Sequence, residues 1–137
     1  MAKESYFPEE MLSKSSGEMS LESIAGTLTY FHEQLHLLHW QTGSYAEHQA
    51  LGGLYEYVHS FKDGVIEKLM GYMGKRPQVF KIPSIKQSSP ISVVEELCTF
   101  AYDLYEWAGK NHYCDVENLA QELSGTAAKT KYLLTLS

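Results

Sequence analysis

The sequence is poor in cysteine, in net positive charge and in long apolar runs. Its two cysteines, Cys98 and Cys114, have no CxxC or zinc-finger spacing, which excludes a disulfide framework and favours a reducing compartment; we interpret both as small packing residues. The formal net charge of −6 gives no general attraction to nucleic acid, so DNA binding is not expected. No stretch approaches the roughly 18 apolar residues of a membrane span, and the first residues lack the apolar core of a signal peptide. We therefore expect a cytoplasmic protein without a membrane partner.

Proline is also scarce, and most of it falls in one segment. Three of the four prolines, Pro77, Pro83 and Pro90, lie between Lys75 and Ile91. Proline interrupts helical hydrogen bonding, so this segment cannot continue a helix. It is long enough to connect opposite ends of a bundle.

Outside this segment, apolar residues recur at spacings of three and four, which is typical of amphipathic helices. The predicted helices run from Ser20, which with Ser23 offers a cap, for about 20 residues, from Tyr45 for nearly thirty, from just after Pro90 to near Gly109, and from about Asp115 to the C-terminus. Two helical pairs joined by one long connection are typical of ferritin-like bundles. We therefore predict an all-α, ferritin-like four-helix bundle over residues 20–137, with a long crossover between the second and third helices and an N-terminal extension over residues 1–19.

Histidines and carboxylates gather in the first two predicted helices. Asp63 and Glu67 are four residues apart, so they share one helical face, where they would repel each other without a cation. His48 follows the break between the helices. Imidazole nitrogen and carboxylate oxygen together suit Fe, Mn or Zn. Spacings of four and three place three histidines of the first helix on one stripe: His32, His36 and His39.

These residues also allow interpretations without such a site. Lys62 and Lys68 each adjoin a carboxylate in sequence and could supply the countercharge in place of a metal. A histidine that points toward a core is more often a packing residue than a ligand. Two Glu-x-x-His pairs, Glu33–His36 and Glu56–His59, offer a rival di-iron centre inside one bundle, although both lie on the first two helices.

The same segments resemble a known family. The tripeptide LHW, then His48, then LYEYVHSFKDGVIEKL, then GKRP, resemble the core of the Dps-like mini-ferritins, the DNA-binding proteins from starved cells. The resemblance covers roughly residues 20–137. It implies a ferroxidase site formed by His39, His48, Asp63 and Glu67, with the tryptophan of LHW packed beside it.

The resemblance also implies an assembly and an activity. In mini-ferritins, histidines of one subunit face carboxylates of another across a two-fold interface, and six such dimers close into a hollow twelve-subunit shell. This chain would then be a homo-oligomer that oxidises Fe(II) with peroxide or dioxygen and stores the iron, with Zn or Mn as other metals that suit the ligands.

Three features depart from the family pattern. The segment between His39 and His48 is about three residues shorter, and Gly52 stands where the family often has another carboxylate. The N-terminal extension is not lysine-rich, as it is in members that bind DNA. A second function stays open: a ferritin-fold assembly or partner-binding protein without iron chemistry.

Overall fold

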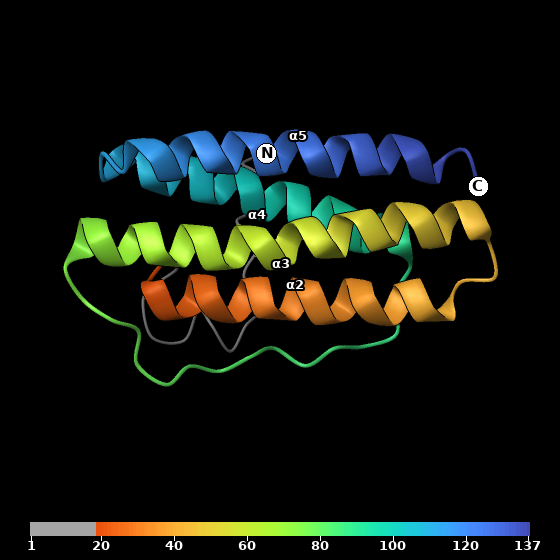
Figure 1. Ribbon diagram of the computed structural model, residues 1–137, viewed down its shortest axis with the longest axis horizontal. Helices are drawn as coiled ribbons and strands as arrows, with labels where there is room; N and C mark the ends of the chain where they lie inside the picture. Colours follow the sequence, from red (N-terminus) through yellow and green to blue (C-terminus); the bar gives the residue numbers. More distant parts are fainter. Residues whose placement is uncertain (1–18) are drawn as a thin grey trace, which may run out of the picture.

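Four helices make up most of the computed structural model, which describes residues 19–137. They are α2 (Leu21–Gln41), α3 (Tyr45–Met73), α4 (Pro90–Lys110) and α5 (Cys114–Leu134), and the described residues contain no strand. The four helices lie alongside one another (Figure 1), with α2 packed mainly on α3 and α4 mainly on α5. The prediction of an all-α four-helix bundle is confirmed. Residues 1–18 of the predicted N-terminal extension lie outside the described part of the chain.

Short polar residues set where the helices begin. Ser20 and Ser23, which the sequence offered as a cap, form a capping box before α2, each side chain accepting the other residue's backbone N–H at 3.0 and 2.9 Å. Ser44 and Ser89 cap α3 and α4 in the same way through their hydroxyls. Gly74, in the left-handed conformation (φ 68°), ends α3.

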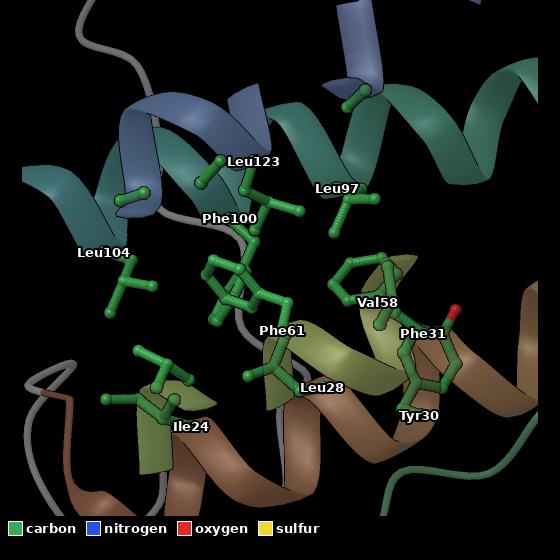
Figure 2. Close-up of a cluster of buried hydrophobic side chains, with 14 of the residues drawn as sticks. Ile24, Leu28, Tyr30, Phe31, Val58, Phe61, Leu97, Phe100, Leu104 and Leu123 are labelled. Carbon is green, nitrogen blue, oxygen red and sulfur yellow. The ribbon is translucent and has the colours of Figure 1, made fainter. Parts of the chain in front are cut away.

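The core lies between the helices and is built from side chains of all four. Figure 2 shows Phe31 of α2, Val58 and Phe61 of α3, and Phe100 of α4 converging, and none of the four is more than 7% exposed. Burying a side chain of this size contributes roughly 1.5–3 kcal/mol relative to leaving it in water. The apolar side chains that recur at helical spacing in the sequence therefore make the contacts between the helices.

The two cysteines have different environments. Cys98 is partly buried against the core, as interpreted from the sequence. Cys114 is exposed at the start of α5, so its interpretation as a packing residue is wrong. Its position as the first residue of α5 leaves it facing solvent.

The connection between α3 and α4 is extended and is attached to α2. We call residues 75–88 the strap; it contains no helix or strand. Gln34 of α2 is fully buried and binds the backbone of Lys86 twice, donating to its carbonyl at 2.7 Å and accepting its N–H at 2.9 Å. Nearer the start of α2, Glu22 accepts the backbone N–H of Gln78 at 2.7 Å. Side-chain hydrogen bonds from α2, and not backbone pairing with a strand, therefore hold the strap against the bundle.

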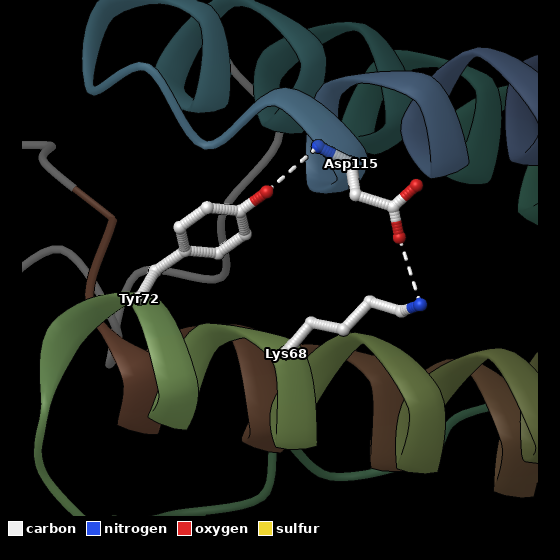
Figure 3. Close-up of polar contacts among 3 residues, drawn as sticks. All are labelled: Lys68, Tyr72 and Asp115. Atoms are coloured by element: carbon white, nitrogen blue, oxygen red, sulfur yellow. Dashed lines mark hydrogen bonds and ion pairs between the residues drawn. The ribbon is translucent and has the colours of Figure 1, made fainter.

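A tyrosine of α3 caps the start of α5. Tyr113 precedes α5 without a side-chain cap, and Asp115 donates its backbone N–H to the Tyr72 hydroxyl at 3.0 Å (Figure 3). The carboxylate of Asp115 also pairs with Lys68 at 2.8 Å. The hydrogen bond and the charge of Asp115 raise the pKa of the Lys68 ammonium. Both contacts attach the end of α3 to the beginning of α5.

Candidate metal-binding site

One side of the α2–α3 pair carries a continuous series of stacked and tilted rings, which we call the histidine face. Tyr55 lies at its centre, with ring centroids 4.3 Å from His36, 5.2 Å from His39 and 5.5 Å from His32. Five of the six histidines of the chain belong to it. The members of the histidine face are His32, His36, His39, Trp40, His48, Tyr55 and His59.

His39 and His48, two of the four predicted ligands, form a reciprocal pair at the corner between α2 and α3. Their rings stack with centroids 3.7 Å apart and planes inclined by 19°. The Nδ1 of His39 lies 2.8 Å from the carbonyl oxygen of His48, and the Nδ1 of His48 lies 2.9 Å from the carbonyl oxygen of His39. The carbonyl of His39 lies in the last turn of α2, where it has no helical partner, so the second bond also satisfies the helix end.

This pairing fixes the chemistry of both rings. A carbonyl oxygen only accepts hydrogen bonds, so each Nδ1 must carry a proton. In a neutral imidazole the other nitrogen, Nε2, is then the basic one. Neither Nε2 takes part in a hydrogen bond among residues 19–137. Metal-binding histidines are commonly oriented in this way, with the remote N–H donated to a backbone carbonyl and the free nitrogen left for the metal.

Gly52 provides the space that the His39 ring occupies. A Cβ atom added at Gly52 would lie 3.0 Å from His39 Cε1 and 3.2 Å from His39 Nδ1, closer than side chains normally approach. At this position the family pattern often has a carboxylate. Here the absence of a side chain lets the imidazole lie against the backbone of α3.

The two predicted carboxylate ligands, Asp63 and Glu67, lie one turn apart on α3 and are exposed. Within residues 19–137 neither makes a hydrogen bond or an ion pair. The lysines that were the alternative countercharges are engaged elsewhere. Lys62 donates to the Thr29 hydroxyl at 3.2 Å, and Lys68 pairs with Asp115. The interpretation of Asp63 and Glu67 as partners of these lysines is therefore wrong.

One chain does not bring its histidines and carboxylates together. An α-helix rises about 1.5 Å per residue, so His48 and Asp63 lie roughly 22 Å apart along α3. In the described part of the chain, no group of three or more His, Cys, Asp or Glu side chains is arranged to hold a metal ion. The four predicted ligands therefore occur as two separate pairs.

The rival di-iron centre inside the bundle is contradicted. Glu33 and Glu56 are both exposed. Among the described residues, the buried polar side chains are neutral and include no carboxylate: Ser23, Thr27, Gln34 and Thr130. The interior of this bundle is apolar where such a centre would have to lie.

Sequence reasoning missed the extent of the histidine face. His32 packs on His59 with centroids 5.0 Å apart and on Tyr55. Burial lowers the pKa of His32, and the nearby His59, Lys62 and His36 lower it further against the opposing effect of Glu33. The sequence does contain a signal for this face in the spacing of Tyr55 and His59, which follow His48 by about two and three helical turns.

Trp40 lies at the rim of the histidine face. Its ring packs on His36 at a centroid distance of 4.0 Å and is 67% exposed. The family resemblance implied a tryptophan packed beside the ligands. Trp40 instead reaches His39 only through His36, whose ring centroid lies 6.2 Å from that of His39.

Comparison with known proteins gives a match to a protein family. No curated protein and no solved structure matches the chain. None of the helices in residues 19–137 combines the length and the apolar character needed to cross a membrane. A family model described as a family of unknown function matches residues 39–134, from His39 through α3, the strap, α4 and α5. The chain therefore belongs to this family of unknown function, DUF5856.

Proposed function

We propose that this protein is a Dps-like mini-ferritin that oxidises Fe(II) at a site shared by two subunits and stores the iron in an oligomeric shell. His39 and His48 of one subunit and Asp63 and Glu67 of its partner would hold the iron, which is the substrate of the reaction. The observation that carries the proposal is the reciprocal His39–His48 pair, because its two Nδ1 hydrogen bonds leave the Nε2 of each ring as the basic nitrogen, without a hydrogen bond in residues 19–137.

The strap supports the ferritin-like part of the proposal. Its hydrogen bonds follow α2 from Glu22 to Gln34, so the chain passes along the length of that helix before α4 begins (Figure 1). A connection of this kind lets α3 and α4 run in the same direction, which is the ferritin-like arrangement. We therefore propose that the strap is the crossover of a ferritin-like bundle.

The spacing along α3 supports sharing between two subunits. His48, Tyr55, His59 and Asp63 are seven, four and four residues apart, so they follow one stripe of the helix. Two α3 helices packed antiparallel about a two-fold axis near Tyr55 would set His48 of each opposite Asp63 of the other. In such a C2 contact both sites form together, since each residue pair occurs twice.

The proposed ligands suit ferrous iron and its oxidation. Neutral imidazole binds Fe(II) without adding charge, and carboxylates stabilise the higher charge of Fe(III), so the mixed set favours loss of an electron. Two Fe(II) ions would each give one electron to one hydrogen peroxide, whose O–O bond breaks to yield two water molecules once two protons are added. Asp63 and Glu67, which lack a countercharge in the described chain, would be neutralised by the iron they bind.

A second candidate is a ferritin-fold assembly or partner-binding protein without iron chemistry. One observation favours it: no metal-binding group of three side chains occurs within residues 19–137 of a single chain. The metal content of the purified protein separates the two functions. Neither candidate includes DNA binding, because acidic residues outnumber basic ones by 17 to 11.

Metal-dependent thermal stability tests the proposed ligands. A ligand that binds only the folded state raises the melting temperature, so Fe(II) under anaerobic conditions, or Zn(II), should stabilise the wild-type protein. His39→Ala and Asp63→Asn should lose this shift. Asp63→Asn should not destabilise the metal-free protein, because it removes an exposed, unpaired charge close to Glu67.

Two matched variants serve as controls. His112→Asn removes the one histidine outside the histidine face, and Glu106→Gln removes an exposed carboxylate on α4. Both should keep the wild-type shift. Equal shifts in all five proteins would place the metal elsewhere, and no shift in any of them would favour the assembly protein.

A further inference from the structure

We infer that the strap docks into the groove between α4 and α5 of a second copy of this chain. This contact is distinct from the proposed two-fold contact of α3, and it deepens the proposed function by naming how dimers would join into a larger assembly. The inference uses three features of the surface: an apolar ridge on the strap, the strap's charge, and a groove on the other side of the bundle.

The strap presents an apolar ridge to solvent. Val79, Ile82 and Ile85 recur every third residue and are 100%, 50% and 45% exposed. The residue that follows Ile82, Pro83, is buried, so the opposite side of the strap faces the bundle. A period of three with prolines and without internal backbone hydrogen bonds is typical of a polyproline II segment. Such segments bind grooves lined by aromatic side chains.

The strap is the basic part of an acidic chain. Its four basic residues give it a charge of +4, with no Asp or Glu between them, so the other residues of the chain together carry −10. Attraction is therefore strongest between the strap of one copy and an acidic surface of another. The basic residues of the strap are Lys75, Arg76, Lys81 and Lys86.

A groove between α4 and α5 has the complementary character. It has a volume of about 240 Å³, and Tyr102 and Tyr105 line it with ring centroids 6.5 Å apart. Glu106 is exposed one helical turn after Tyr102 and adds negative charge near its rim. The remaining lining residues are small or polar: Ala101, Ala120, Gln121 and Ser124.

The strap and α5 lie on opposite sides of the bundle (Figure 1). A chain therefore cannot fill its own groove with its own strap, and the contact must join two chains. Because two different surfaces meet, the contact is heterologous and can repeat around a ring or a shell.

The first test is the size of the assembly, measured by light scattering and native mass spectrometry. Val79→Glu places a charge on a fully exposed ridge residue, so the fold should be unchanged, and subunit association through this contact should weaken about tenfold or more. Leu136→Glu, a matched change at a residue 60% exposed near the C-terminus, should leave association unchanged. Assembly of Val79→Glu to the wild-type size and with the wild-type concentration dependence would overturn the inference.

The second test separates this contact from the α3 contact. Gln121→Arg blocks the groove of one variant, and Val79→Glu blocks the strap of the other. Each variant alone should stop at a dimer if the α3 contact forms, or at a monomer if it does not. A mixture should form additional complexes through one intact strap and one intact groove, and a mixture no larger than its separate components would overturn the inference.

Other binding partners of the strap would give other results. The strap could instead bind DNA, seen as retardation of plasmid DNA at about 0.15 M salt, or a membrane, seen as binding to vesicles of anionic lipid. Either result, if it is lost in Lys81→Glu, would assign the strap to that ligand and overturn the inference. Protection of the backbone amides of Val79, Ile82 and Ile85 from hydrogen exchange in a dilute monomer would show that the ridge is covered within its own chain, with the same consequence.

Discussion

Replacing Gly52 by alanine tests whether the His39–His48 pair depends on the missing side chain. Alanine normally stabilises a helix interior by about 0.5–1 kcal/mol relative to glycine. Here the new Cβ would lie 3.0 Å from His39 Cε1, so the imidazole has to move. A shift of a few tenths of an ångström lengthens the hydrogen bond from His39 Nδ1 to the carbonyl of His48 and displaces the stacked ring, which weakens both contacts.

The expected loss exceeds the expected gain. A neutral hydrogen bond contributes about 0.5–1.5 kcal/mol, and a stacked ring pair contributes a similar amount. If both contacts are lost, subtracting the helical gain leaves a net destabilisation of up to about 2.5 kcal/mol for Gly52→Ala, and of about 1 kcal/mol at the midpoints of these ranges. Gly125→Ala, in the middle of α5 with nothing within 4 Å of the new Cβ, is the matched control and should stabilise by about 0.5–1 kcal/mol.

Urea denaturation of both variants at neutral pH without metal gives the comparison directly. The free energy of unfolding should fall for Gly52→Ala and rise for Gly125→Ala. If Gly52→Ala is stabilised as much as the control, the His39 ring does not occupy the space beside Gly52, and the ligand geometry proposed for it is refuted.

Three further predictions concern the rest of the fold. Tyr72→Phe removes the hydroxyl that caps α5, and it should lower the free energy of unfolding by about 0.5–1.5 kcal/mol in urea titrations, whereas an unchanged value would show that the cap contributes nothing. The backbone of His112 has a φ of 61°, a left-handed conformation that is strained in residues other than glycine. His112→Gly should therefore raise the free energy of unfolding by about 1 kcal/mol, and a lower melting temperature would contradict strain at this residue. Burial lowers the pKa of His32 below 6.5 in the folded chain, so the unfolded chain binds more protons and stability is lost as pH falls from 6.5 through the folded pKa. His32→Asn should weaken the dependence of unfolding on pH between about 7.5 and about 5.5, and a dependence identical to wild type would refute this assignment.

The helices were predictable because local signals and tertiary packing agree in them. Ser20 and Ser23 mark the start of α2 in sequence and form the capping box in the structure. Pro90 marks the start of α4. The positions of Leu28, Phe31 and Leu35 in the core follow from helical spacing alone. Fold class and helix bounds therefore needed little beyond periodicity.

The site was less predictable because its geometry depends on contacts between helices. Spacing shows that His39 is near the end of one helix and His48 near the start of the next, but not that each donates to the other's carbonyl. The role of Gly52 is visible only once the His39 ring lies against it. Likewise, nothing in the local sequence of Lys68 indicates that it pairs with Asp115 on another helix rather than with Glu67.

The measurement that tests the shared iron site most directly is Fe(II) oxidation by mixed subunits. One variant, His39→Ala with His48→Ala, keeps only the carboxylates, and the other, Asp63→Asn with Glu67→Gln, keeps only the histidines. Each should be inactive alone. After dissociation and random reassembly of equal amounts, half of the dimers would be mixed with one complete site in two, so about a quarter of the wild-type activity should return. A mixture as inactive as its components, while the wild type oxidises iron, would contradict a site built from two subunits.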